Sequence, residues 1–326
     1  MPPPNTFQNS SKWIFGSFNA DFAWLYLPGL LAVPVSFLPK ENPLYLFSWF
    51  LIVVILDVGH VYLTAWRTYL NPAERSRKSF YLFVPILILG FMLLAVQFPT
   101  LALTIPTIYF LAQSFHGVRQ HFGISKWYQI KNKSFRKRSD YFQYALCALP
   151  LLYGMVKVHS RFNPQTFPAA YASFALLALI WAYVAVVIGW ALFELKAWRK
   201  SRELNRILSV MIPASFYTVL FSSASVYFAV FPLMASHAVT YLGVTHVALV
   251  KTRSPLLSNK FLAFLGLLVT FACGTGGYYF GQFARMSPNR IIFTFSVLQM
   301  TFFFCHVFID SFIWRSKHPE AALIYS

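Results

Sequence analysis

Histidines and acidic residues inside long apolar stretches are the groups of this sequence that could do chemistry. Six of the eight histidines lie in such stretches, whereas only three of the nine acidic residues do. The histidines are His60, His116, His121, His237, His246 and His306, and the acids are Asp57, Glu194 and Asp310. An ionisable group within a lipid bilayer costs a few kcal/mol or more, so each is a candidate functional group. Imidazole binds iron and zinc well, which predicts a histidine-rich metal site.

Two spacings place a histidine and a carboxylate on one helix face. Asp57 precedes His60 by three residues, and His306 precedes Asp310 by four. Residues three or four apart are neighbours on a helix surface. Such a pair suits a shared metal ion, or a histidine whose ring N–H is held by the acid. Together with the other histidines in apolar stretches, these pairs predict a set of candidate metal ligands that comprises His60, His116, His121, His237, His246, His306, Asp57 and Asp310.

Helical geometry leaves the roles of two further histidines open. His116 and His121 lie about 140° apart around a helix, so His121 joins the site only if the helix unwinds. His237 and His246 lie about 180° apart, so we expect one to be a ligand and the other to be nearby or structural. The number of metal ions, one or two, also stays open. Glu194, at the edge of an apolar stretch, is expected to be an interfacial charge.

The composition indicates that membrane-spanning helices carry these residues. Of the 326 residues, 58% are hydrophobic and 11% are charged, against about 25% charged in a soluble domain. The apolar runs are long enough for helices of about 20 residues and lack the alternation of a membrane β-barrel. We predict an all-α, polytopic transmembrane helix bundle of about eight to ten spans, with ten favoured. The ten spans are expected at residues 22–39, 43–66, 80–97, 99–123, 141–156, 166–195, 207–224, 226–250, 261–282 and 291–314.

The distribution of basic residues predicts the orientation of the chain. With both termini in the cytoplasm, 21 of the 27 Lys and Arg residues lie on the cytoplasmic side, as basic loops generally do. We expect a cytoplasmic segment at residues 1–21, one transmembrane domain at residues 22–314 and a cytoplasmic tail at residues 315–326, in a bacterial cytoplasmic membrane. The basic segment Lys126–Arg138 then contacts anionic membrane lipids rather than nucleic acid.

This topology brings histidines from four helices to a similar depth. The second, fourth, eighth and tenth expected spans all run from the outside to the cytoplasm. His60, His116, His246 and His306 then lie within about 6 Å of a common depth, at a rise of about 1.5 Å per residue. His237 lies deeper. A level set of histidines with two carboxylates favours a metal centre over isolated buried hydrogen bonds.

Short segments around these histidines resemble a known family. They are Ser114-Phe115-His116-Gly117, His121-Phe122-Gly123, Ser236-His237 and the stretch from His306 to Arg315, in which Asp310 follows His306 by one turn. These segments resemble the histidine stations of the Brp/Blh family, membrane-bound β-carotene-cleaving dioxygenases whose iron is held by histidines from several transmembrane helices. The resemblance covers about four short segments. The family's early His-Gly station followed by Asp is replaced here by Asp57-Val58-Gly59-His60, with the acid before the histidine.

The resemblance implies iron, O₂ and an apolar substrate, with His60, His116, His237 and His306 as the ligands. With Asp57 and Asp310, which are expected to orient His60 and His306, these residues form the predicted catalytic set. Together with the residue pattern, it leads us to expect a non-haem iron oxygenase that oxidises or cleaves a lipid or isoprenoid. Two alternatives use the same residues. One is a zinc-dependent intramembrane hydrolase, and the other is a transporter of protons or metal ions. No organic cofactor is evident in the sequence, and the oligomeric state stays open.

Overall fold

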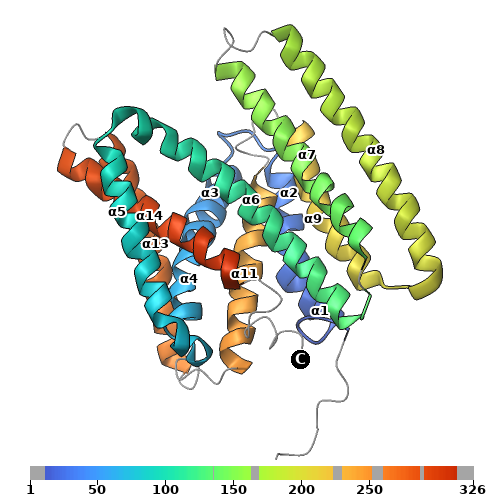
Figure 1. Ribbon diagram of the computed structural model, residues 1–326, viewed down its shortest axis with the longest axis horizontal. Coiled ribbons are helices and arrows are strands. Elements are labelled where there is room, and N and C mark those ends of the chain that lie inside the picture. The colour runs from blue at the N-terminus through green and yellow to red at the C-terminus, as the bar shows by residue number, and fades with distance from the viewer. Residues whose placement is uncertain are drawn as a thin grey trace, which may run out of the picture. The chain divides into compact units, whose positions relative to one another are not determined.

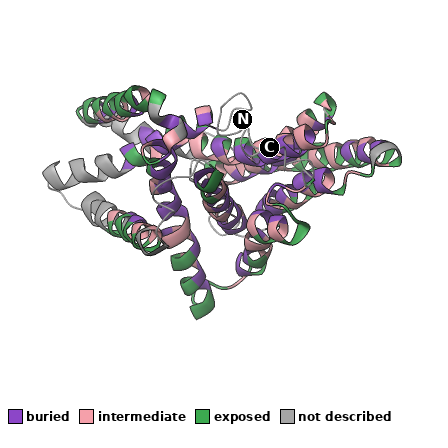
Figure 2. Cartoon of the chain, turned by 90° about the horizontal axis from the view of Figure 1, so that it is seen from below, coloured by how far each residue is buried: buried purple, intermediate pink, exposed green. Residues whose placement is uncertain are grey.

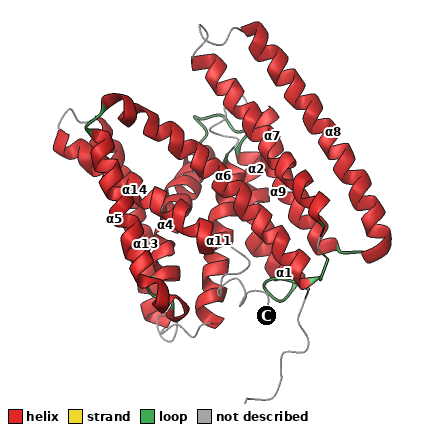
Figure 3. Cartoon of the chain, viewed as in Figure 1, coloured by secondary structure: helices red, strands yellow, loops and turns green. Residues whose placement is uncertain are grey.

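The computed structural model describes residues 12–134, 136–162, 169–222, 230–251, 260–286 and 290–313. The secondary structure of these residues is helical, with no strand among them, which confirms the all-α prediction (Figure 3). The tail at residues 315–326, with Arg315 of the terminal motif, lies outside the described residues, as do residues 1–11 of the N-terminal segment.

The helices follow the apolar runs of the sequence (Figure 1). Near the N-terminus, α-helical and π-helical segments join end to end: α1 (Phe18–Asp21), η1 (Phe22–Tyr26) and α2 (Leu27–Val35), then α3 (Pro43–Trp49), η2 (Phe50–Asp57) and α4 (Val58–Thr68). After the short 3₁₀ segment η3 (Pro72–Arg77), the remaining helices are α5 (Lys78–Val96), α6 (Pro99–Lys131), α7 (Lys137–Phe162), α8 (Ala169–Ser201), α9 (Leu204–Ser222), α11 (Phe231–Lys251), α13 (Lys260–Met286) and α14 (Arg290–Ile313).

Within the described residues, six helical stretches are long and apolar enough to cross a membrane. They are Phe18–Val35, Pro43–Thr68, Lys78–Ala95, Ala169–Arg199, Leu204–Ser222 and Phe231–Lys251. Two shorter apolar helical stretches, Ala263–Gly277 and Met300–Ile313, fall within the last two expected spans. The expected span at residues 99–123 lies within α6, and that at residues 141–156 lies within α7, although neither helix is among the six. The chain is therefore of the membrane-protein class, whereas ten spans remain a prediction.

The chain forms two compact units, and the expectation of a single transmembrane domain stays a prediction. The first unit is built from Met1–Leu46 and Gly117–Ser236, and the second from Phe47–His116 and His237–Ile324. The unit boundaries therefore fall within the continuous helices α6 and α11. Every residue of the predicted catalytic set belongs to the second unit.

In the first unit, α7 packs against both α8 and α9. Leu146, Trp190, Val210 and Ala214 form one buried cluster of these three helices. Glu194 of α8 is buried and accepts a hydrogen bond of 2.7 Å from Arg206 Nη1 of α9. The sequence led us to expect an interfacial charge here, and Glu194 is a buried ion-pair partner that connects the end of α8 to α9.

In the second unit, close packing of α4 against α13 supports the region that carries the predicted ligands. A side chain at Gly274 of α13 would meet the backbone of Gly59 at 3.0 Å, so the two helices touch through glycines. α5 packs against α14 through a buried cluster that includes Tyr81, Cys305 and Ile309. Buried, intermediate and exposed residues follow one another along the helices, as Figure 2 shows.

Candidate metal centre

Four histidines from four helices meet inside the second unit. His60 lies on α4, His116 on α6, His237 on α11 and His306 on α14. Their side chains are buried, with His60 and His306 each 1% exposed, His237 4% and His116 5%. Burying several imidazoles together is unfavourable unless their nitrogen atoms find partners, because an unsatisfied buried polar group costs about 1–3 kcal/mol.

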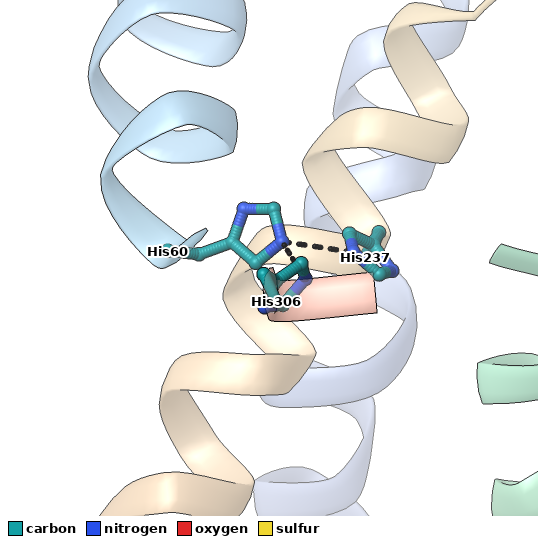
Figure 4. Close-up of side chains that lie close together, drawn as sticks. All are labelled: His60, His237 and His306. Carbon is teal, nitrogen blue, oxygen red and sulfur yellow. Dashed lines mark hydrogen bonds between the residues drawn. The ribbon is translucent and has the colours of Figure 1, made fainter. Parts of the chain in front are cut away.

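The Nε2 atoms of three of these histidines lie close to one another. His60 Nε2 lies 3.1 Å from His306 Nε2 and 2.9 Å from His237 Nε2 (Figure 4). A ring nitrogen carries either one hydrogen or one lone pair in the ring plane, so His60 Nε2 cannot form ordinary hydrogen bonds with both. Two nitrogens that each bind a metal at about 2.1 Å are about 3.0 Å apart at a right angle and about 3.4 Å apart at a tetrahedral angle. The observed separations fit ligands at about a right angle.

The four rings form a four-sided arrangement. Around it, consecutive ring centroids are 4.6 Å apart for His60 and His237, 5.0 Å for His237 and His116, 4.9 Å for His116 and His306, and 4.7 Å for His306 and His60. The diagonal from His237 to His306 is longer, at 6.2 Å. A regular tetrahedron would make the diagonal equal to the sides. The four ring centroids are therefore not arranged as a regular tetrahedron.

The two predicted acids lie beside this ring of imidazoles. Asp310 Oδ2 is 3.8 Å from His116 Nε2, and Asp310 Oδ1 is 3.9 Å from His306 Nδ1. Asp57 Oδ1 is 3.7 Å from His60 Nδ1. All three distances exceed those of direct hydrogen bonds. The predicted histidine–acid pairs are thus neighbours in space without a direct hydrogen bond between them.

Two buried hydroxyl groups, which we did not predict, complete the surroundings of His306. Thr64 Oγ1 lies 2.7 Å from His306 Nδ1 and 3.1 Å from Tyr241 Oη. Tyr241 in turn donates a hydrogen bond of 3.0 Å to Asp310 Oδ1. The guanidinium group of Arg67 lies over the Tyr241 ring, 5.0 Å from its centroid. Arg67 itself is buried within α4.

A regular spacing in the sequence could have revealed these hydroxyl groups. Each of the four histidines has a polar residue four positions later, on the same face of its helix. The pairs are His60 and Thr64, His116 and Gln120, His237 and Tyr241, and His306 and Asp310. All four of these polar residues are buried. The sequence predicts a shared face for His306 and Asp310 and also for His116 and Gln120. The pairs with Thr64 and Tyr241 were missed, because threonine and tyrosine are common in apolar helices.

Two predicted ligands do not take part in this arrangement. His121 belongs to the first unit, where its Nδ1 lies 3.2 Å from Tyr217 Oη and its Nε2 lies 3.5 Å from Ser236 Oγ. His246 is exposed. Neither histidine belongs to a group of possible metal ligands among the described residues. Of the two histidines on α11, it is His237 that points to the other imidazoles.

The donor atoms fit a transition-metal ion. Two groups of possible ligands overlap: His60, His237 and His306 form one, and His116, His306 and Asp310 form the other. Within each group the ligand atoms lie within 4.8 Å of one another. His116 Nε2 is buried and has no hydrogen-bond partner among the described residues, which suits an atom that binds a metal. Imidazole nitrogen with little carboxylate oxygen favours iron or zinc over magnesium or calcium.

Comparisons of this chain with models of protein families, with curated proteins and with solved structures find no match. The metal centre is therefore interpreted from its own geometry.

Proposed function

We propose that this protein is a membrane-integral, non-haem iron oxygenase that oxidises or cleaves an apolar lipid or isoprenoid substrate. The observation that carries the proposal is the ring of four buried imidazoles from four helices. The short segments that resemble the Brp/Blh family support iron as the metal and an apolar molecule as the substrate.

The separations of 2.9 and 3.1 Å between the Nε2 atoms, shorter than the roughly 3.4 Å of a tetrahedral zinc site, favour an oxygenase over a closed structural zinc site. Structural zinc is almost always tetrahedral and has no open position. An iron ion bound here would supply the redox chemistry that O₂ requires.

The residues of the chain contribute binding, orientation and the exclusion of water. His60, His116, His237 and His306 would hold the ion, and their burial keeps bulk water away from it. Asp310 is fully buried beside His116 and His306, so it compensates part of the positive charge of a divalent ion. An apolar substrate dissolved in the bilayer matches a centre built within apolar helices.

Metal analysis of the purified protein tests this proposal. We expect about one iron ion per chain after reconstitution with Fe²⁺ under anaerobic conditions, because the two groups of possible ligands share His306. His306→Ala should abolish stoichiometric binding, because His306 contributes to both groups of possible ligands. His246→Ala is the matched control, since it removes an exposed histidine of α11 and should leave binding unchanged.

The identity of the metal decides between the alternatives. If the protein binds only zinc when Fe²⁺ and Zn²⁺ compete, the proposed oxygenase is contradicted and an intramembrane hydrolase is favoured. Absence of any bound metal in the folded protein would contradict both enzymes and favour a transporter that uses the same histidines. If iron binds, comparison of the lipids of cells with the wild-type protein and with His306→Ala identifies the substrate by its accumulation.

A further inference from the structure

The hydrogen bonds around His306 form a continuous chain across three helices. It runs from His306 of α14 to Thr64 of α4, from Thr64 to Tyr241 of α11, and from Tyr241 back to Asp310 of α14. All members are buried: Tyr241 and Asp310 are fully buried, His306 is 1% exposed and Thr64 is 6% exposed. Bulk water therefore does not compete for these hydrogen bonds.

The hydrogen bond from Tyr241 to Asp310 determines which group is the donor in each of the other hydrogen bonds of this series. Tyr241 has one hydroxyl hydrogen, which it donates to Asp310 Oδ1. Its oxygen must then accept at the 3.1 Å contact, so Thr64 donates to Tyr241. The Thr64 hydroxyl hydrogen is thereby used, and Thr64 Oγ1 can only accept from His306 Nδ1 at 2.7 Å. His306 is therefore protonated on Nδ1.

This direction determines which nitrogen of His306 is able to bind a metal. A neutral imidazole has one N–H and one lone pair, so a hydrogen on Nδ1 leaves the lone pair on Nε2. His306 Nε2 is the atom that faces His60 Nε2 at 3.1 Å. We propose that Tyr241 and Thr64 are positioning residues, which connect His306 to Asp310 and hold His306 in the tautomer and orientation that bind the metal. The inference rests on the proposed metal centre.

The arrangement differs from a direct histidine–carboxylate pair. Asp310 Oδ1 is 3.9 Å from His306 Nδ1, too far for a hydrogen bond, and two hydroxyl groups span the gap. Asp310 Oδ2 remains directed to His116 Nε2, 3.8 Å away. The Asp310 carboxylate therefore interacts with two proposed ligands. It is connected to His306 through the two hydroxyl groups, and it lies close enough to His116 for an electrostatic interaction. Arg67, over the Tyr241 ring, helps to hold that ring in place.

Variants that remove single hydroxyl groups test this inference in the full-length protein. Tyr241→Phe and Thr64→Val each break the chain and leave every proposed metal ligand intact. Partners of metal-binding histidines typically contribute about 10–100-fold to metal affinity, so we expect a loss of that size for Fe²⁺, measured by competition with a chelator. The visible absorption bands of the Co²⁺-loaded protein should also shift, because the orientation of an imidazole ligand changes.

Three further variants separate positioning from general stability. Thr64→Ser retains the hydroxyl group and should restore both the affinity and the Co²⁺ spectrum. Tyr217→Phe removes a buried tyrosine hydroxyl next to His121, outside the centre, and Thr245→Val removes a buried threonine hydroxyl of α11. Both of these variants should bind Fe²⁺ as the wild type does, even where thermal unfolding shows a lower stability.

The outcomes distinguish this inference from the proposed function. If the wild-type protein binds neither Fe²⁺ nor Co²⁺, the metal centre itself is refuted. If the wild type binds both ions, and Tyr241→Phe and Thr64→Val bind them with wild-type affinity and spectrum, the positioning role is refuted and the metal centre stands. Should Tyr241→Phe fail to fold, the comparison of Thr64→Val with Thr64→Ser decides in the same way.

Discussion

The environment of an imidazole determines whether it can serve as a metal ligand. His60 has its Nε2 directed to two other ring nitrogens, and its Nδ1 lies near Asp57 without a hydrogen bond. Both nitrogens of His121, by contrast, lie within reach of hydroxyl groups, those of Tyr217 and Ser236. One histidine therefore has nitrogen available for a metal, and the other is used in packing. Residue type and apolar context, which the two share, do not separate these roles.

Alanine substitutions at these two positions should have opposite consequences. We expect His60→Ala to lose bound metal with a penalty larger than the roughly 10–100-fold cost of removing an outer partner, because a direct ligand is gone. We expect His121→Ala to retain its metal and to lose about 1–3 kcal/mol of stability, because the hydroxyl groups of Tyr217 and Ser236 lose their partner. Metal content and thermal unfolding of the two purified variants check this. Loss of metal in His121→Ala at full stability would make His121 a ligand.

Among the elements, α4 has the strictest requirement on its surroundings. It carries His60 and Thr64 on one face, and it touches α13 directly behind His60 through Gly59 and Gly274. A methyl group at Gly274 would lie 3.0 Å from Gly59 Cα and 3.2 Å from Gly59 N, which is closer than carbon atoms normally approach. The separation of α4 and α13 is thus set by residues without side chains, and it fixes the position of the neighbouring His60.

Two glycines of α13 offer a matched test of this close approach. Gly274→Ala should destabilise the protein by about 1–3 kcal/mol, the usual cost of overpacking, and should weaken metal binding by displacing His60. Gly276→Ala, two residues further along the same helix, meets no atom within 4 Å. Since alanine favours helix by up to about 1 kcal/mol over glycine, Gly276→Ala should be neutral or stabilising. Equal stability and equal metal affinity of the two variants would contradict a tight α4–α13 contact.

At the level of the whole molecule, the surface itself indicates a membrane environment. Exposed large apolar residues occur along α8, where Phe174 is 75% exposed, Tyr171 68% and Trp181 64%. Soluble monomers seldom expose extended apolar patches, so such a helix requires lipid or detergent. In such an environment, we expect the excess of basic residues to follow the orientation of the chain in the membrane.

Cysteine labelling in intact cells checks the predicted orientation. Cys147 and Cys305 are buried, so replacement of the exposed Cys273 by serine gives a background of low reactivity. In that background, Lys40→Cys should react with a membrane-impermeant maleimide, because Lys40 is expected on the outer side. Arg138→Cys should react only after the cells are permeabilised, because it lies in an expected cytoplasmic segment. Labelling in the reverse pattern would invert the topology.

The sequence predicted the helical class, and its candidate set included all four central histidines, for a simple physical reason. Residues such as His306 and Asp310 are costly in apolar helices, so their mere presence carries information. Thr64 and Tyr241 were missed because threonine and tyrosine are common in such helices, and their role depends on which helices become neighbours. Whether His237 or His246 faces the other imidazoles depends on how α11 is oriented about its own axis, which the sequence does not reveal. The burial of Glu194 likewise depends on its contact with Arg206. Contacts of this kind, between residues far apart in the chain, have no local signature.

The deep burial of the four imidazoles also has a consequence for the kinetics of metal exchange. None of the four histidines is more than 5% exposed, so an ion can leave or arrive only when the helices that carry them separate transiently. Loading then accompanies the assembly of the helices, in the way that metal binding and folding are coupled in other metalloproteins. A centre of this kind retains its ion through dilution and brief exposure to chelators, and the rate of helix opening sets the lifetime of the bound state.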